Sequence, residues 1–179
     1  NLPTQIINDL DQVFTFIKEN PGIKHISFYD LIVEEHTILG NQDYHYLSEE
    51  EESDWYKYLQ ERLHKLGFSQ YEISNWAKDN SYQSQHNLGY WRIEDYIGIG
   101  LSSSSCYQGY RYTNTCSIKE YYQSLDNQQL PIKGYEEFGK YEQAYDTIML
   151  GLRTSEGIDE KVVENFPLKK EFFGGMVML

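Results

Sequence analysis

The stretch from Tyr71 to Asn114 restricts the possible folds of this 179-residue chain more than any other part of it. Residues 68–74 alternate apolar and polar side chains, which predicts a half-buried β-strand. Residues 96–101 predict a second strand, in which Gly98 and Gly100 leave one face bare of side chains. Paired glycines in a strand are typical of a close approach by a ligand or by another backbone. The stretch therefore predicts a small sheet with an unusually open surface.

A polar segment and a tyrosine-rich hairpin complete this region. Residues 75–85 are polar and predict a loop between the two strands. Tyrosines flank Gln108-Gly109, a pair suited to a tight hairpin turn, at positions Tyr107, Tyr110 and Tyr112. The chain contains 17 Tyr, 8 Phe and 3 Trp, so broad half-polar surfaces are expected in clefts or at contacts.

The N-terminal part predicts a helix followed by a buried strand. Apolar residues recur at helical spacing between Ile6 and Ile17, and Asn20-Pro21-Gly22 ends the helix. Residues 23–33 (IKHISFYDLIV) lack clean alternation, as expected for a parallel strand covered on both faces. A helix, a short turn and a buried strand together predict an α/β layer.

Capping patterns predict further helices. Ser48 and Glu51 form a capping box before a stripe of apolar residues, and Gly67 stands where a C-terminal glycine belongs. That stripe is Trp55, Leu59, Leu63 and Leu66. Ser117 and Glu120 form a second capping box. Residues 140–153 and 159–166 predict two more helices, with Tyr141, Ala144, Tyr145, Ile148 and Leu152 facing inward on the first and Pro167 ending the second.

Charge and composition exclude several classes of protein. The formal charge of −13 disfavours duplex nucleic acid and anionic membranes as partners, since both require clustered Lys and Arg. No run of 18 apolar residues could span a bilayer, and no secretory signal is visible. With 40% hydrophobic and 24% charged residues, the chain is expected to be globular.

The two cysteines suit a reducing cytoplasm. Nine residues separate Cys106 from Cys116, which matches no common zinc or redox spacing, so we expect two buried free thiols. The serines at positions 102–105 predict a loop whose hydroxyls bond to nearby backbone. The chain begins at Asn1 without an initiator methionine and ends in an apolar run, which we interpret as a piece of a longer protein.

His86 is the sharpest candidate for a ligand-binding residue. It lies in HNLGYW beside Asn87, Tyr90 and Trp91, and Trp76 is expected nearby in a flat aromatic wall. A neutral imidazole is a good axial ligand for heme iron, and aromatic side chains can pack against the macrocycle. The alternative is structural: His86 bonds within a loop, and Tyr90 and Trp91 belong to the core.

These motifs resemble a known family. YEISN-W-A, then HNLGYW, then Y-x-G-x-G, together with LGLR followed by Gly157, look like the oxygen-independent coproporphyrinogen III oxidase-like radical SAM proteins. HNLGYW resembles the heme-chaperone branch of that family. The resemblance implies three domains: the last βα units of an incomplete radical SAM barrel (1–67), a small, mostly antiparallel sheet with HNLGYW (68–116), and a truncated helical C-terminal region (117–179).

The resemblance also implies cofactors. The family holds a 4Fe-4S cluster on a run of three cysteines and binds S-adenosylmethionine at its open iron. This chain has no such run, so those ligands are expected upstream, and no catalytic residue is expected in residues 1–179. Many relatives carry a histidine where Ser104 stands, which puts any second ligand there in doubt.

We therefore interpret the chain as part of a cytoplasmic radical SAM protein, a heme chaperone that binds heme near His86. A genuine coproporphyrinogen oxidase and a non-catalytic protein-interaction module are the alternatives. Heme or a porphyrin is the expected ligand and heme-receiving proteins the expected partners, and exposed strand edges favour a homodimer.

Overall fold

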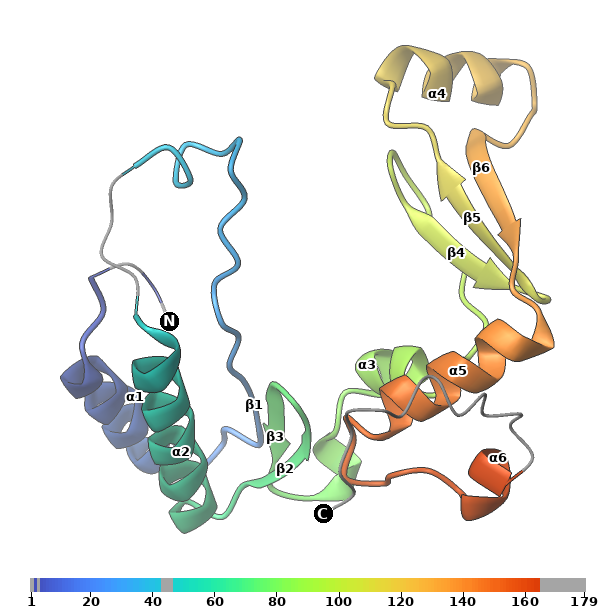
Figure 1. Ribbon diagram of the computed structural model, residues 1–179. Helices are drawn as coiled ribbons and strands as arrows, with labels where there is room; N and C mark the ends of the chain where they lie inside the picture. Colours follow the sequence, from blue (N-terminus) through green and yellow to red (C-terminus); the bar gives the residue numbers. More distant parts are fainter. Residues whose placement is uncertain (1, 3, 43–46, 165–179) are drawn as a thin grey trace. The chain divides into compact units, whose positions relative to one another are not determined.

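The computed structural model describes residue 2 and residues 4–42 and 47–164, and it has the predicted mixed α/β fold with two three-stranded antiparallel sheets (Figure 1). By packing, the chain divides into two compact units, residues 1–84 and 85–179. The domain boundaries expected after residues 67 and 116 stay predictions. No described helix is long and apolar enough to cross a membrane.

Two helices cover one face of the first sheet in unit 1. They are α1 (Ile7–Glu19) and α2 (Glu49–Lys65), which pack side by side (Figure 1). The predicted capping box begins α2, because the Ser48 hydroxyl accepts from the Glu51 N–H at 3.3 Å and the Glu51 carboxylate accepts from the Ser48 N–H at 2.8 Å. Gly67 follows α2 in the left-handed region, with φ of 81°, as a C-terminal glycine should.

The core of unit 1 lies between these helices and the sheet. Its buried members come from both helices and from the strand region, and they are Leu10, Phe14, Ile17, Leu59, Leu63, Phe68 and Trp76. Helical spacing predicted the buried residues of α1 and α2 in this cluster, but Ile6 and Val13, which the same pattern included, are exposed. Trp55 and Leu66 of the predicted stripe are partly buried against this cluster.

The first sheet differs from the sequence prediction in two ways. It consists of β1 (His25–Ser27), β2 (Ser69–Glu72) and β3 (Asn75–Ala77), in the order β1-β3-β2. The loop predicted at 75–85 is wrong at its start, because burial of Trp76 holds β3 as the central strand; the short 3₁₀ helix η1 (Asn80–Tyr82) follows it. The parallel strand predicted at 23–33 is also wrong, because β1 is three residues long and pairs antiparallel with β3.

Unit 2 begins with α3 (Gln85–Trp91) and contains the second sheet. The sheet has the order β4-β5-β6 and is formed by Ser104–Tyr107, Tyr110–Asn114 and Ile132–Glu137. The remaining helices are α4 (Ile118–Asp126), α5 (Lys140–Gly151) and α6 (Glu160–Glu164). The predicted hairpin turn is confirmed, since Gln108 and Gly109 have φ of 50° and 79°, as a two-residue turn with two left-handed positions requires.

The glycine pair does not lie in a strand. In backbone pairing, residues 96–101 meet β4 in an isolated bridge between Tyr96 and Cys106 and form no ladder, so the predicted strand is wrong. Gly100 adopts φ of 115°, which bends the chain away from a ladder. The predicted close approach is confirmed at Gly98, where a Cβ atom would collide with the carbonyl oxygen of Ser104.

The helices of the C-terminal part agree with their predicted positions but bury less than expected. Ser117 caps α4 by accepting from the Glu120 N–H at 3.3 Å. On α5, Ile148 is buried, whereas Tyr141 and Tyr145 are exposed, as is Leu152 directly after the helix. Helical spacing sets which side chains share a face, but the amount of partner surface decides how many of them are covered. The end of the last predicted helix, with Pro167, lies outside the described residues.

Candidate functional site

The candidate residues of HNLGYW lie on α3. His86 and Tyr90 are four positions apart, so they share one face of the helix, and both are exposed. Leu88 faces the interior and is 2% exposed, which fixes the orientation of the helix. Asn87 and Trp91 form a second pair four residues apart and are partly buried. The motif is therefore an amphipathic turn that presents its imidazole to solvent.

Three aromatic rings form a row that starts at His86. The imidazole meets the ring of Tyr90 edge-on, with centroids 4.8 Å apart, and Tyr90 meets Tyr96 edge-on at the same distance. Edge-to-face contacts at this separation are favourable because the positive ring edge meets the negative ring face. Burial raises the pKa of Tyr96, so its hydroxyl stays neutral. The row holds the His86 ring against its own helix.

Trp76 is not part of this row. It is 1% exposed in the core of unit 1, where it packs against Phe28 and Tyr56. The expectation of one flat wall that includes Trp76 is therefore wrong. All three residues of β3 are buried, so the tryptophan lies in the core, which the polar residues around it in the sequence conceal.

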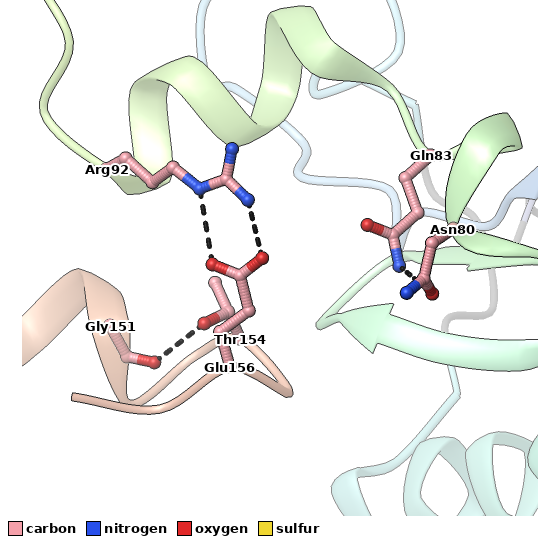
Figure 2. A network of polar contacts seen from close by, with 6 residues as sticks. All are labelled: Asn80, Gln83, Arg92, Gly151, Thr154 and Glu156. Carbon is pink, nitrogen blue, oxygen red and sulfur yellow. Dashed lines mark hydrogen bonds and ion pairs between the residues drawn. The ribbon is translucent and has the colours of Figure 1, made fainter. Parts of the chain in front are cut away.

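A bidentate ion pair anchors the end of α3. Figure 2 shows the Arg92 guanidinium facing the Glu156 carboxylate, with Nε donating to Oε2 at 3.2 Å and the second bond made by an Nη atom. The hydrogen bond from Arg92 lowers the pKa of Glu156, and the same bond raises the pKa of Arg92. Glu156 lies in the turn after α5, against which α3 packs. The LGLR-x-x-x-G turn thus helps to position HNLGYW.

The serine run bonds to nearby backbone as predicted. The Ser103 hydroxyl donates to the Gly100 carbonyl at 2.9 Å, and the Ser105 hydroxyl accepts from the Gly98 N–H at 3.0 Å. Ser104 and Ser105 also begin β4, so only the first half of the run is a loop. These hydroxyls serve the fold of the glycine segment.

The cysteines do not suit an iron–sulfur cluster. Both are free thiols; Cys106 is buried as expected, but Cys116 is exposed, which corrects that part of the prediction. A cluster requires three closely spaced thiolates, and the sequence has two cysteines. In the part of the chain that the structure describes, no group of three or more His, Cys, Asp or Glu residues could hold a metal ion.

Sequence reasoning missed a buried polar network around YEISN. Glu72 and Asn75 are 4% and 0% exposed, and the Asn75 amide donates to the Glu72 carboxylate. The Ser74 N–H donates to the other Glu72 oxygen at 2.9 Å, and the Ser27 hydroxyl donates to Asn75. Nearby, His25 Nε2 and the Tyr71 hydroxyl lie 2.8 Å apart. The sequence signal for this network was Glu72, a charged residue inside a strand whose pattern predicts burial of one face.

The chain is similar in sequence to several known proteins. The chain is 32% identical to the heme chaperone HemW of Lactococcus lactis over 147 residues, which cover 80% of this chain and 38% of that protein. It is 36% identical to HemW of Synechocystis over 144 residues and 33% identical to HemW of Bacillus subtilis over 142 residues. These matches cover 76–77% of this chain and 34–37% of those relatives. No family model matches the chain.

The solved structure of HemN from Escherichia coli, a radical SAM coproporphyrinogen III oxidase, has the same fold. The match has a TM-score of 0.67 at 14% identity and covers 86% of this chain and 38% of that one. The fold is therefore that of a segment of a radical SAM coproporphyrinogen oxidase. By sequence, the chain belongs to the oxygen-independent coproporphyrinogen III oxidase-like family, and the three relatives given above are named heme chaperones. It spans about a third of the length of those relatives.

Proposed function

We propose that this chain supplies the heme-binding part of a radical SAM heme chaperone, in which His86 would bind the heme iron. The observation that carries the proposal is the exposed imidazole of α3, held edge-on against Tyr90 at 4.8 Å. The names of the sequence relatives support the same ligand. An exposed imidazole can reach an iron atom without any rearrangement of the core.

Several side chains in and beside the motif have distinct parts in this proposal. Bound heme would supply an iron atom that accepts a nitrogen lone pair. His86 offers that lone pair, while its contact with Tyr90 restricts rotation of the ring. The buried side chain of Leu88 anchors α3 to the interior of unit 2, and the Arg92–Glu156 ion pair holds the C-terminal end of α3. The residues therefore orient the imidazole, and a preformed orientation lowers the entropic cost of binding.

The iron–sulfur cluster and S-adenosylmethionine of the family do not enter this proposal through residues 1–179. Neither Cys106 nor Cys116 lies in a three-cysteine run, so we propose that any cluster is held by other sequence of the full-length protein. The free thiols support a cytoplasmic location. Transfer of heme to a recipient protein and formation of a homodimer belong to the same proposal.

A hemin titration of His86→Ala tests the proposal. In the unaltered chain we expect a shifted Soret band and saturable binding, and in His86→Ala an affinity lower by at least about tenfold, which is about 1.4 kcal/mol. His36→Ala is the matched control, because His36 is also exposed but lies in unit 1. An unchanged Soret spectrum and affinity in His86→Ala would refute His86 as the ligand.

A genuine oxidase is the second candidate, and the fold shared with HemN favours it. The two candidates differ in product. Turnover of coproporphyrinogen III by the full-length protein would support the oxidase, and heme binding without turnover would support the chaperone.

A further inference from the structure

Unit 2 contains an apolar cleft that the proposed heme site does not use. It has a volume of about 480 Å³, within the range of small-molecule sites. Its walls come from three separate segments: residues 97–100, the β4–β5 hairpin with α4, and residues 130–132. None of the α3 residues lines it. We propose that this cleft binds a neutral, planar, largely hydrocarbon molecule.

The floor of the cleft is one face of the second sheet. Ser105 and Tyr107 alternate with Cys106 along β4, so they share a face, and Tyr112 lies directly opposite Ser105 on β5. Cys106 and its partner Arg111 point to the opposite face, where Arg111 stacks on Phe138 at 3.9 Å. The tyrosine face is thus available to a ligand, while the other face packs within unit 2.

Two polar side chains of the walls, Asn114 and Ser105, are engaged in hydrogen bonds of the fold. The Asn114 amide donates to the Gly100 carbonyl and to the Ser103 hydroxyl, both at 2.9 Å. The Ser105 hydroxyl accepts from the Gly98 N–H. These bonds hold residues 97–100 in place, so the cleft is preformed. What they leave toward the cleft is mainly aromatic and aliphatic surface.

Charge selects the class of ligand. Among the described residues that line the cleft, none is charged, although the whole chain has a formal charge of −13. An anion would find no cation in these walls and would meet the negative field of the protein, and a cation would find no carboxylate in them. Carboxylate-bearing tetrapyrroles are therefore poor candidates. A neutral molecule meets neither penalty.

Apolar side chains at the rim lack cover that such a ligand would provide. Ile97, Ile99 and Leu130 are 68%, 90% and 76% exposed. Tyr121 and Leu125 of α4 contribute to the facing wall. A flat molecule inserted between the rim and the tyrosine floor would remove this apolar surface from water, which is the main driving force for binding an uncharged ligand.

The test uses two dyes with one carbon skeleton. N-phenyl-1-naphthylamine is neutral, and 8-anilinonaphthalene-1-sulfonate is the same molecule with a sulfonate group added. We expect the full chain to bind the neutral dye saturably, one per chain, with a dissociation constant at least about tenfold lower than that of the sulfonate. Equal affinity for the two dyes would overturn the proposal.

The Ile99→Asp variant places the binding in the cleft. Ile99 is almost fully exposed, so the substitution should leave folding intact, as circular dichroism would verify. The dissociation constant of the neutral dye should rise at least about tenfold, whereas Ile32→Asp, at an exposed isoleucine of unit 1, should leave it unchanged. An unchanged constant in Ile99→Asp would overturn the proposal. Loss of hemin binding in Ile99→Asp would also overturn it, because the cleft would then accept a carboxylate-bearing ligand.

Discussion

The two units of this chain use their apolar residues differently. Unit 1 gathers seven of them into one buried cluster between two helices and a sheet. Among the described residues of unit 2 the buried apolar ones are few (Leu88, Cys106, Phe138 and Ile148), and exposed apolar side chains surround the cleft. Unit 2 also contains the hydrogen-bonded β4–β5 hairpin and ion pairs such as Arg111–Asp146. Unit 1 therefore has one continuous buried core, whereas the described part of unit 2 leaves apolar side chains exposed around a cleft.

Phe14→Ala should have the largest effect, because it removes a ring from the cluster of unit 1. Phe14 is 2% exposed, and loss of a buried phenylalanine costs about 3–5 kcal/mol of the free energy of unfolding. Urea denaturation followed by tryptophan fluorescence measures it, since Trp76 lies in the same core. Phe16→Ala is the control: Phe16 is on the same helix but 60% exposed, so a change within about 0.5 kcal/mol is expected. Equal losses would contradict the packing of α1.

Asn75→Ala should have the next largest effect, also in unit 1. It leaves the buried Glu72 carboxylate and the Ser27 hydroxyl without their amide partner, which costs about 1–3 kcal/mol. Ser27→Ala should cost less, about 0.5–1.5 kcal/mol, because Asn75 then keeps its bond to Glu72. The same denaturation assay compares the two. If Asn75→Ala were the milder change, the network would not be a stabilising part of YEISN.

Gly98→Ala probes the cleft wall of unit 2. The added methyl group would collide with the Ser104 carbonyl, and overpacking of this kind costs about 1–3 kcal/mol. Faster amide exchange in residues 96–106 would report the loosened segment. In Gly134→Ala the methyl group meets no atom within 4 Å, so the stability of β6 should be kept or slightly raised. If amide exchange in residues 96–106 were unchanged in Gly98→Ala, the backbone of this segment would be able to move enough to accommodate the methyl group.

Glu156→Gln should have the smallest effect, because the ion pair with Arg92 is partly exposed. Both side chains keep 41–52% of their surface, and such pairs contribute about 0.2–1 kcal/mol. The pKa of Glu156 is lowered by the hydrogen bond from Arg92, so the pair stabilises the folded state above the unfolded-state pKa of about 4.3. That contribution is lost as the pH falls through the lower folded-state pKa. At pH 7 the native chain should therefore be more stable than Glu156→Gln. Below pH 4 the unfolding curves of the native chain and of Glu156→Gln should converge.

Local sequence patterns predicted the elements that depend on neighbouring residues. Both capping residues, the end of α1 before Pro21 and the turn at Gln108-Gly109 agree with the structure, because short-range hydrogen bonds and φ preferences decide them. Strand assignments failed where distant packing decides. Trp76 makes β3 a buried strand despite polar neighbours, and Gly100 bends residues 96–101 out of the ladder despite an alternating pattern.

The candidate site also has a part that local sequence predicted and a part that only the tertiary structure shows. The HNLGYW motif identified His86 and Tyr90, and helical spacing alone brings these two rings together. Tyr96 joins the row only because the chain turns after α3, and sequence spacing does not show that turn. The cleft escaped prediction altogether, since residues from 97 to 132 must fold together before it exists.

By itself, the sequence determined the helices, their caps, the tyrosine hairpin and the family to which the chain belongs, because each depends on residues close together in the chain or on their identity. Only the tertiary structure decided that Trp76 is buried, that Glu72 has an amide partner, that Cys116 is exposed and that neutral walls enclose a cleft in unit 2. Whether a side chain is buried, and which hydrogen-bond partner it has, depends on contacts between segments that are distant in the sequence. The free energy of these contacts comes from surfaces that meet only in the folded chain.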